Sequence, residues 1–242
     1  MSCSLCGGVV VDEVDLTDMK KGKLIVIEGS SDGIGKTTQF NLLKQRLLDE
    51  NIKVESHHFP SYNTYQGKPV EKYLKGTFGK PDQLSPYFVN SLYAVDRAIT
   101  WNIDLKKKFE QGDTILLDRY TTSSLIYQST LIEDNEEKKR FLNYVMDFEY
   151  NKIGIKKPDK VIFLTADLDI ITKMRNKRKE ENGEAVEGDI HENDLTFMKK
   201  VYDNATFVAN YLSWDIINCS RDGQMKSIEE ISDEVYKAVS SS

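Results

Sequence analysis

The chain has 242 residues, and 39 acidic against 33 basic side chains give a formal net charge of -6. This balance argues against a protein that coats nucleic acid or an anionic membrane. Hydrophobic residues make up 39% and charged residues 30% of the chain, which is typical of a globular protein and excludes a disordered or collagen-like one. Every apolar run is far shorter than the roughly 18 residues that a membrane helix needs, so we expect no membrane span.

The first 22 residues are expected to be a flexible extension. They lack the basic segment and the long apolar run of a secretory signal. Cys3 and Cys6 could form half of a zinc site that a partner completes, but zinc needs about four ligands and no second pair follows. The remaining cysteine, Cys219, is far away in the sequence, so we expect no disulfide framework and a reducing, cytoplasmic location.

Strands and helices alternate after this extension. The segment 23–29, KLIVIEG, predicts a buried strand, and a glycine-rich turn follows it. The next segment predicts a helix, because Phe40, Leu43 and Leu47 recur at helical spacing. Further strands are predicted at 54–59, 114–118, 160–165 and 214–219. Five strands alternating with helices indicate an α/β fold, a three-layer, doubly wound parallel sheet in a single domain over 23–242.

Ligands of such a sheet bind beyond the carboxyl ends of its strands. The functional residues should therefore lie in the loops after Ile27, Phe59, Asp118 and Thr165. A basic run at 173–179 precedes two glutamates in an acidic chain, and we interpret it as a solvated helix or a mobile lid.

The segment 30–38, SSDGIGKTT, is the strongest functional signal. Its closely spaced Gly33 and Gly35 leave backbone N–H groups available to wrap a polyphosphate. In such a loop Lys36 reaches the β and γ phosphates, and the hydroxyl of Thr37 coordinates Mg²⁺. The predicted ATP and phosphate contacts are Ser31, Asp32, Gly33, Ile34, Gly35, Lys36, Thr37 and Thr38.

One feature of the loop departs from the usual spacing. Gly29 lies six positions before Gly35 instead of five, so the pattern is met only if Ser30 takes the first position. The extra serine could be absorbed as a bulge, because the spacing from Asp32 to Lys36 is unchanged.

A carboxylate and a guanidinium end the third predicted strand. Asp118 occupies the position where phosphate-loop proteins hold Mg²⁺ or its water, although it could serve only as a helix cap. Arg119 is shaped to bridge two phosphates whose charge builds up during transfer. The guanosine-specificity pattern Asn-Lys-x-Asp is absent, which disfavours a GTPase switch.

Five segments in chain order resemble the thymidylate kinases, which phosphorylate dTMP from ATP. They are IEGSSDGIGKTTQ, HHFPSY, LYAVDR, DRYTTSSLIYQ and GDIHE, and the resemblance runs from about Lys23 to the C-terminus. It implies a phosphate-loop kinase of nucleotide biosynthesis with a lid over about 174–193. It also implies Mg²⁺, ATP as a co-substrate, dTMP as the acceptor, and a homodimer.

The resemblance implies an acceptor site as well. Asp32 would accept from the 3′-hydroxyl of the acceptor sugar, unless it only stabilises the loop as an Asx turn. Tyr93 would stack on thymine and Arg97 would donate to a ring carbonyl; the alternative is a core tyrosine beside a surface ion pair through Asp96. Tyr127 would lie under the deoxyribose. The implied dTMP contacts are Asp32, Phe59, Pro60, Tyr93, Arg97, Arg119, Ser123, Ser124, Tyr127 and Gln128.

The implied lid closes over ATP and excludes water. Asp189 and Glu192 match the lid's Asp-x-x-Glu. Because Ile34 rather than an arginine stands in the phosphate loop, the catalytic cation would come from Arg175 or Arg178. The implied catalytic residues are Lys36, Asp32, Arg119, Arg175 and Arg178. Tyr202 fits the helix that follows, and a core aromatic fits it equally well.

The acceptor-phosphate clamp departs from the family pattern. The family usually carries an arginine just after Phe-Pro, whereas Ser61, Tyr62 and Asn63 follow here. Arg119 could compensate, or Lys68 or Lys72 could swing in. We expect a dTMP kinase; a kinase for another nucleotide or nucleoside and a non-catalytic ATP-binding sensor are the alternatives.

Overall fold

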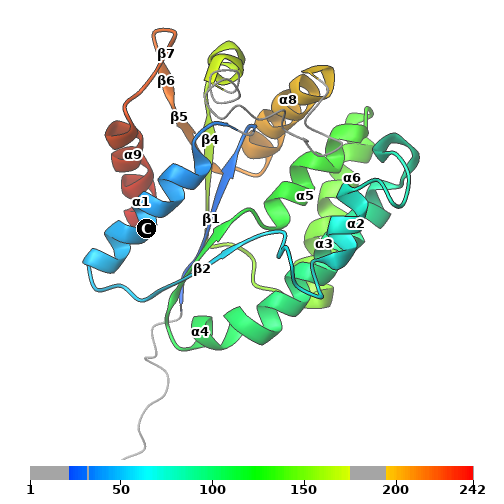
Figure 1. The fold of residues 1–242 in the computed structure, drawn as a ribbon, viewed down its shortest axis with the longest axis horizontal. Helices are drawn as coiled ribbons and strands as arrows, with labels where there is room; N and C mark the ends of the chain where they lie inside the picture. The colour runs from blue at the N-terminus through cyan, green and yellow to red at the C-terminus, as the bar shows by residue number, and fades with distance from the viewer. Residues whose placement is uncertain (1–21, 32, 175–194, 242) are drawn as a thin grey trace, which may run out of the picture.

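A parallel sheet of five strands organises the protein (Figure 1). The computed structural model describes residues 22–31, 33–174 and 195–241. The strands are β1 (Leu24–Gly29), β2 (Val54–His58), β3 (Thr114–Asp118), β4 (Lys160–Thr165) and β5 (Asp215–Asn218), in the order β2-β3-β1-β4-β5. The predicted fold class is confirmed, and every predicted strand lies within one residue of its expected bounds.

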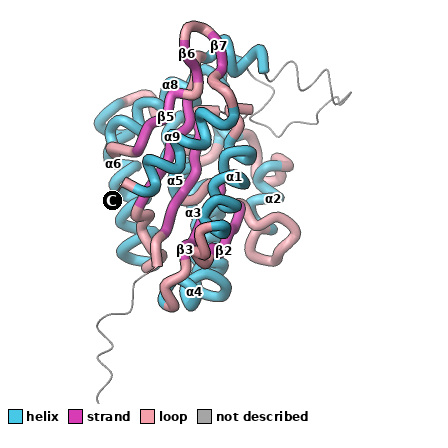
Figure 2. The backbone as a smooth tube through the Cα atoms, turned by 90° about the vertical axis from the view of Figure 1, so that its left-hand side faces the viewer, coloured by secondary structure: helices cyan, strands magenta, loops and turns pink. Residues whose placement is uncertain are grey.

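Helices cover both faces of this sheet. On one face lie α1 (Lys36–Asp49) and α9 (Ile228–Ser240), which stand in front of the strands in Figure 2. On the other face lie α3 (Pro86–Thr100), α5 (Thr121–Tyr127), α6 (Asn135–Met146) and α8 (Leu195–Tyr211). Two shorter helices are α2 (Lys68–Leu74) and α4 (Lys106–Glu110). Irregular helical turns occupy Pro81–Gln83, Trp101–Leu105, Ser129–Leu131 and Asp147–Ile153. No helix among the described residues has the length and apolar character to cross a bilayer.

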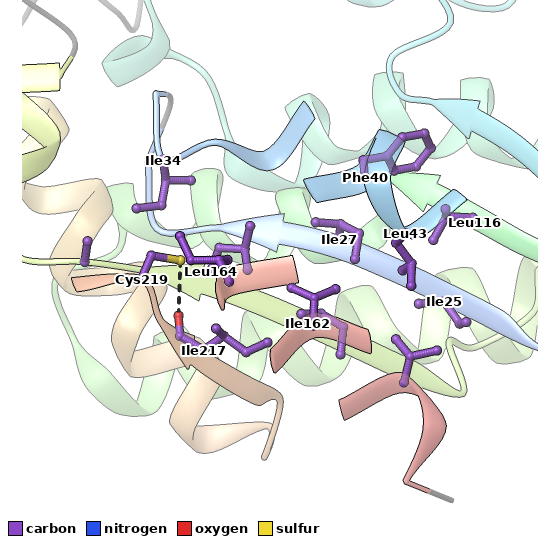
Figure 3. Packing of buried hydrophobic residues seen from close by; sticks show 14 of the residues in the cluster. Ile25, Ile27, Ile34, Phe40, Leu43, Leu116, Ile162, Leu164, Ile217 and Cys219 are labelled. Atoms are coloured by element: carbon purple, nitrogen blue, oxygen red, sulfur yellow. Dashed lines mark hydrogen bonds between the residues drawn. The ribbon is translucent and has the colours of Figure 1, made fainter. Parts of the chain in front are cut away.

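The sequence of β1 explains why both faces are covered. Successive side chains of a strand point to opposite faces, and every residue of β1 is buried. Ile25 and Ile27 pack in one core cluster with Leu43 of α1 (Figure 3). Leu24 and Val26 belong to a cluster on the opposite face. A strand buried on both faces has a continuous apolar sequence, as this one does.

The register of the central strands fixes where the functional loops meet. Asp118 at the end of β3 is the partner of Ile27 in β1 and of His58 in β2. The carboxyl ends of these three strands therefore lie side by side. The phosphate loop, the Phe59–Pro60 segment and Arg119 leave the sheet at the same edge.

A short antiparallel hairpin was not predicted. It joins β6 (Ser220–Arg221) to β7 (Gln224–Met225) through Asp222 and Gly223, both with positive φ. An Asp-Gly pair is the usual centre of such a tight turn. Strands of two residues are too short to give a periodic signal, so only this dipeptide marked the hairpin in the sequence.

Candidate active site

The phosphate loop folds back closely over the end of β1. A Cβ at Gly29 would lie 2.8 Å from Cγ2 of Ile34 and 3.0 Å from Cδ of Lys36, so glycine lets the lysine side chain pass there. Gly35 is the N-cap of α1 with φ 95, a left-handed conformation that favours glycine. The extra Ser30 continues the sheet pairing, because its N–H donates to the carbonyl of Leu164 at 2.9 Å.

The loop encloses a cavity of about 270 Å³, which we call the phosphate cavity. It is lined by Gly33, Gly35, Lys36, Thr37, Thr38, His58, Asp118 and Arg119. The start of α1 lines this cavity, and the unpaired N–H groups and positive dipole end of a helix N-terminus attract anions. Most of the predicted phosphate contacts are therefore brought together.

Two predicted phosphate contacts lie elsewhere. The side chain of Ile34 is 1% exposed and packs in the core beside α1 (Figure 3). Its side chain is therefore no phosphate ligand, and the residue anchors the loop instead. Ser31 lines the neighbouring cavity described below. Asp32 lies outside the described residues.

Asp118 lines the phosphate cavity, and one of its carboxylate oxygens accepts no hydrogen bond from the described residues. Its Oδ2 accepts from Nδ1 of His58 at 2.9 Å, while Oδ1 is buried and has no hydrogen-bond partner in the described part of the chain. Burial raises the pKa of this carboxyl, but the hydrogen bond and charge of His58, with Lys36 and Arg119, outweigh burial and leave the pKa lowered. Asp118 therefore stays ionised at neutral pH.

A magnesium ion fits these residues. The carboxylate of Asp118 and the hydroxyl of Thr37 line the same cavity, and oxygen is the ligand that Mg²⁺ prefers. The described residues hold no cluster of three His, Cys, Asp or Glu suited to a metal. Mg²⁺ usually binds one or two carboxylates together with substrate phosphates and water. The helix-cap alternative for Asp118 is wrong, because α5 has Tyr120 as its N-cap.

A second cavity of about 230 Å³ adjoins the first, and we call it the acceptor cavity. All predicted dTMP contacts within the described residues line it, namely Phe59, Pro60, Tyr93, Arg97, Arg119, Ser123, Ser124, Tyr127 and Gln128. They come from the segment after β2, from α3 and from the region around α5. Further lining residues were not predicted from the sequence, among them Tyr62, Leu74 and Phe197. These apolar or aromatic residues carry no local signal for a ligand site.

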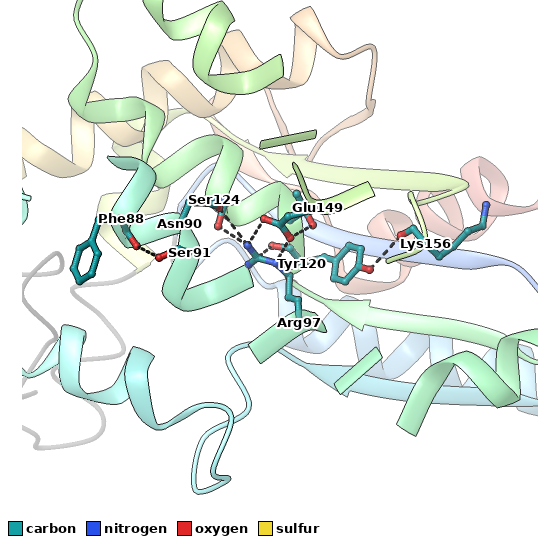
Figure 4. A network of polar contacts seen from close by, with 9 residues as sticks. Phe88, Asn90, Ser91, Arg97, Tyr120, Ser124, Glu149 and Lys156 are labelled. Carbon is teal, nitrogen blue, oxygen red and sulfur yellow. Dashed lines mark hydrogen bonds and ion pairs between the residues drawn. The ribbon is translucent and has the colours of Figure 1, made fainter. Parts of the chain in front are cut away.

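Arg97 is buried and paired. It is 1% exposed and donates through Nε and Nη2 to Glu149, each at 2.7 Å (Figure 4). The alternative of a surface ion pair through Asp96 is wrong, because Oδ2 of Asp96 accepts from the backbone of Ser61 at 2.7 Å. Tyr93 meets Tyr73 edge to face, with ring centroids 6.1 Å apart.

Arg119 connects the two cavities. It lines both of them, as does His58. Its φ of 65 is left-handed, a conformation that a non-glycine residue holds at a cost and that recurs at active sites. Its Nη1 donates to the hydroxyl of Tyr127 at 3.3 Å, and its guanidinium carbon lies 5.4 Å from that ring centroid. The arginine is therefore held between the two cavities.

The residues after Phe-Pro do not replace the missing arginine with another cation. Ser61 is 4% exposed and points inward, whereas Tyr62 is 47% exposed and lines the acceptor cavity. Lys68 pairs with Glu71 at 2.8 Å. Neither Lys68 nor Lys72 lines either cavity, whereas the side chain of Arg119 lines both.

Two buried carboxylates beside the site were also not predicted from the sequence. Glu28 and Glu149 are both 0% exposed. Glu28 had a signal, since it is an acidic residue inside the apolar run of β1. Glu149 had none, because it lies in a charged segment that is expected at the surface.

The lid predictions lie outside the described residues. They comprise Arg175, Arg178, Asp189 and Glu192, and the predicted lid range 174–193 is described only at Met174. Tyr202 follows the predicted lid range. Its hydroxyl donates to the carbonyl of Ala166 at 3.0 Å, and its ring packs against the core cluster. This packing agrees with the prediction of a core aromatic.

Comparisons with known proteins agree with this geometry. The family model for thymidylate kinase matches residues 27–231. A thymidylate kinase of Plasmodium falciparum is 29% identical over 222 residues, 92% of this chain and 91% of that protein. One of Schizosaccharomyces pombe is 31% identical over 175 residues, 71% of this chain and 74% of that protein. A solved structure of thymidylate kinase from Candida albicans matches with a TM-score of 0.65 at 25% identity, over 90% of this chain and 91% of that one.

Proposed function

The chain belongs to the thymidylate kinase family, and we propose from this that it transfers the γ-phosphoryl group of ATP to dTMP, giving ADP and dTDP. One observation carries the proposal. The phosphate cavity and the acceptor cavity adjoin and share His58 and Arg119, so the two substrates can meet end to end. Such transfer depends mainly on positioning and on neutralising charge.

The donor phosphates are held by the phosphate loop in this proposal. Backbone N–H groups around Gly33 and Gly35 donate hydrogen bonds to the phosphate oxygens, and Lys36 balances their charge. Lys36 is only 8% exposed, so its charge acts in a poorly solvated site where electrostatic stabilisation is strong. Arg119 reaches the acceptor phosphate and the phosphoryl group between the substrates.

Thr37 and Asp118 would hold magnesium in this site. A magnesium ion held there would neutralise part of the phosphate charge of ATP. The protein's contribution is an ionised carboxylate, fixed by His58, whose second oxygen is available in the described structure.

The acceptor cavity suits a deoxyribonucleotide pyrimidine. Tyr93 offers an aromatic face to the base, and Arg97 offers a donor to a ring carbonyl. Oε1 of Gln128 is buried without a hydrogen-bond partner among the described residues and provides an acceptor for a ring N–H. We assign Tyr127 to the deoxyribose, where contact excludes a 2′-hydroxyl, and Ser124 to the base.

The remaining roles come from the resemblance alone. Asp32 accepts from the 3′-hydroxyl, Asp189 and Glu192 belong to the lid, and Arg175 or Arg178 supplies the catalytic cation. Closure of this lid excludes water and protects the phosphoryl group from hydrolysis.

A homodimer is part of the proposal. The outer side of α3 carries exposed apolar residues at helical spacing, and Phe88 and Val95 are 40% and 46% exposed. A second copy packed there would bury them. Size-exclusion chromatography with light scattering on the wild type and Val95→Asp tests this: we expect a dimer that the variant weakens, and a monomeric wild type contradicts it.

We also propose a cytoplasmic location. Cys219 is a buried free thiol whose pKa burial raises to about 11, so it stays protonated at neutral pH. An unoxidised thiol is typical of a reducing compartment.

The decisive experiment measures ADP release from Mg-ATP with dTMP, dUMP, dCMP, AMP or thymidine in separate reactions. We expect fast turnover with dTMP and loss of turnover in Lys36→Ala. Turnover with another acceptor alone would assign a different kinase. ATP binding without acceptor-dependent ADP release would indicate the non-catalytic sensor.

A further inference from the structure

The first turn of α5 is anchored from two sides by buried carboxylates. Its four successive hydroxyl residues, Thr121 to Ser124, all make polar contacts inside the protein. Thr122 and Ser123 donate to Oε2 of Glu28 at 2.9 and 2.6 Å. The other two hydroxyls belong to a separate network formed by Arg97 and Glu149.

Glu149 is the charged partner of Arg97 in that network (Figure 4). Its Oε1 accepts from Nη2 of Arg97, and its Oε2 accepts from Nε of Arg97 and from the hydroxyl of Thr121 at 2.9 Å. The paired donors give the planar fork geometry in which a guanidinium and a carboxylate fix each other's orientation. Both side chains are at most 2% exposed, so solvent does not compete for these bonds.

The network leads directly to the acceptor cavity. Arg97 donates from Nη2 to the hydroxyl of Ser124 at 2.9 Å and from Nη1 to the carbonyl of Tyr120 at 3.4 Å. Arg97, Tyr120 and Ser124 line the acceptor cavity, whereas Glu149 and Thr121 do not. Glu149 can therefore affect a ligand only through the residues that it holds.

Charge explains why the pair must be complete. Burial by itself lowers the pKa of Arg97, but the charge and hydrogen bonds of Glu149 outweigh burial and raise it. Arg97 thus remains a cation in the cavity wall. Without Glu149 it would be a buried charge lacking its carboxylate, and it would turn toward other acceptors.

We propose that Glu149 is a positioning residue for recognition of the acceptor base, acting by holding Arg97 and Ser124 in the orientation that the base requires. This inference rests on the proposed function, because it takes dTMP as the occupant of the acceptor cavity. Preorganised side chains lower the cost of binding, so their loss weakens the acceptor and not ATP.

The test compares the Michaelis constants of the two substrates in Glu149→Gln. Glutamine keeps the size of the side chain and one acceptor oxygen but loses the charge and one arm of the fork. We expect the KM for dTMP to rise roughly 10- to 100-fold, the scale of losing one hydrogen bond to a charged group. The KM for ATP should stay within about twofold, since no contact of this network reaches the phosphate cavity.

Thr121→Val and Thr122→Val form a matched pair for the same question. The two threonines are adjacent in one turn, are 0% and 1% exposed, and each donates a hydrogen bond to a buried carboxylate. The side chain of Thr121 also has a hydrogen bond with Tyr150. Only Thr121 contacts Glu149. We expect a severalfold rise in the KM for dTMP in Thr121→Val and a change within twofold in Thr122→Val.

Each outcome decides between positioning and plain structural support. A lower melting temperature with both KM values unchanged in Glu149→Gln and Thr121→Val would overturn the inference. Equal rises of the dTMP KM in the two threonine variants would also overturn it, by showing that α5 responds to any loosening. If Glu149→Gln does not fold, the threonine pair still decides. Failure of the proposed function is distinct, because it removes dTMP-dependent ADP release from the wild type itself.

Discussion

The phosphate cavity and the acceptor cavity adjoin, yet they are built in different ways. The phosphate cavity takes most of its wall from one continuous stretch, 33–38, and relies on backbone N–H groups, a helix N-terminus and the charge of Lys36. The acceptor cavity collects side chains from widely separated segments, and buried bonds such as that between Arg97 and Glu149 hold them.

This contrast suits the ligand that we propose for each cavity. A polyphosphate presents dense charge, which a single loop can bind with its backbone. A base presents shape and a few polar atoms, so its site needs side chains with fixed orientations. Changes in the phosphate cavity should therefore alter the chemical step, and changes around the acceptor cavity should alter binding.

The largest effect should come from Lys36→Ala. Loss of one preorganised charge-stabilising donor lowers kcat by roughly 10² to 10³. We expect dTMP affinity, measured by calorimetry, to be unchanged, because Lys36 does not line the acceptor cavity.

Lys44→Ala is the matched control for this change. Lys44 lies on the same helix and lines neither cavity, so its loss should leave kcat unchanged. Near-native turnover in Lys36→Ala would refute the division of labour between the cavities.

Ile34→Ala should disturb the phosphate cavity because it removes apolar packing that anchors the loop. The side chain packs in the core at 1% exposure, and replacing a buried isoleucine with alanine typically costs about 2 to 5 kcal/mol of stability. Because this side chain anchors the loop, we also expect a higher KM for ATP.

Leu43→Ala separates the two consequences. Leu43 is equally buried in the same cluster, on α1 away from the loop, so its variant should lose similar stability in chemical denaturation with the KM for ATP unchanged. An equal rise of that KM in both variants would mean that Ile34 has no special role in the loop.

The same contrast separates what the sequence could and could not predict. The strands, α1 and the phosphate loop follow from local patterns, because each is specified by neighbouring residues such as Phe40, Leu43 and Leu47. Resemblance supplied the acceptor contacts, since residues from separate segments carry no common periodicity. Nothing in the sequence marked Glu149, because a glutamate in a charged segment is normally exposed and only the tertiary fold buries this one.

The smallest effect concerns the acceptor cavity alone, in a comparison of dTMP with dUMP. The two nucleotides differ by one methyl group, and one such group in an apolar pocket is worth about 1 to 3 kcal/mol. The cavity wall includes Phe59, Leu74 and Phe197, so we expect dUMP to be a substrate with kcat/KM lower by roughly 10- to 200-fold. Steady-state kinetics with both acceptors at saturating ATP measures the ratio, and Lys36→Ala should lower both rates without changing it. A ratio near one would mean that the cavity does not enclose the methyl group, whereas a change of the ratio in Lys36→Ala would mean that the phosphate cavity also selects the base.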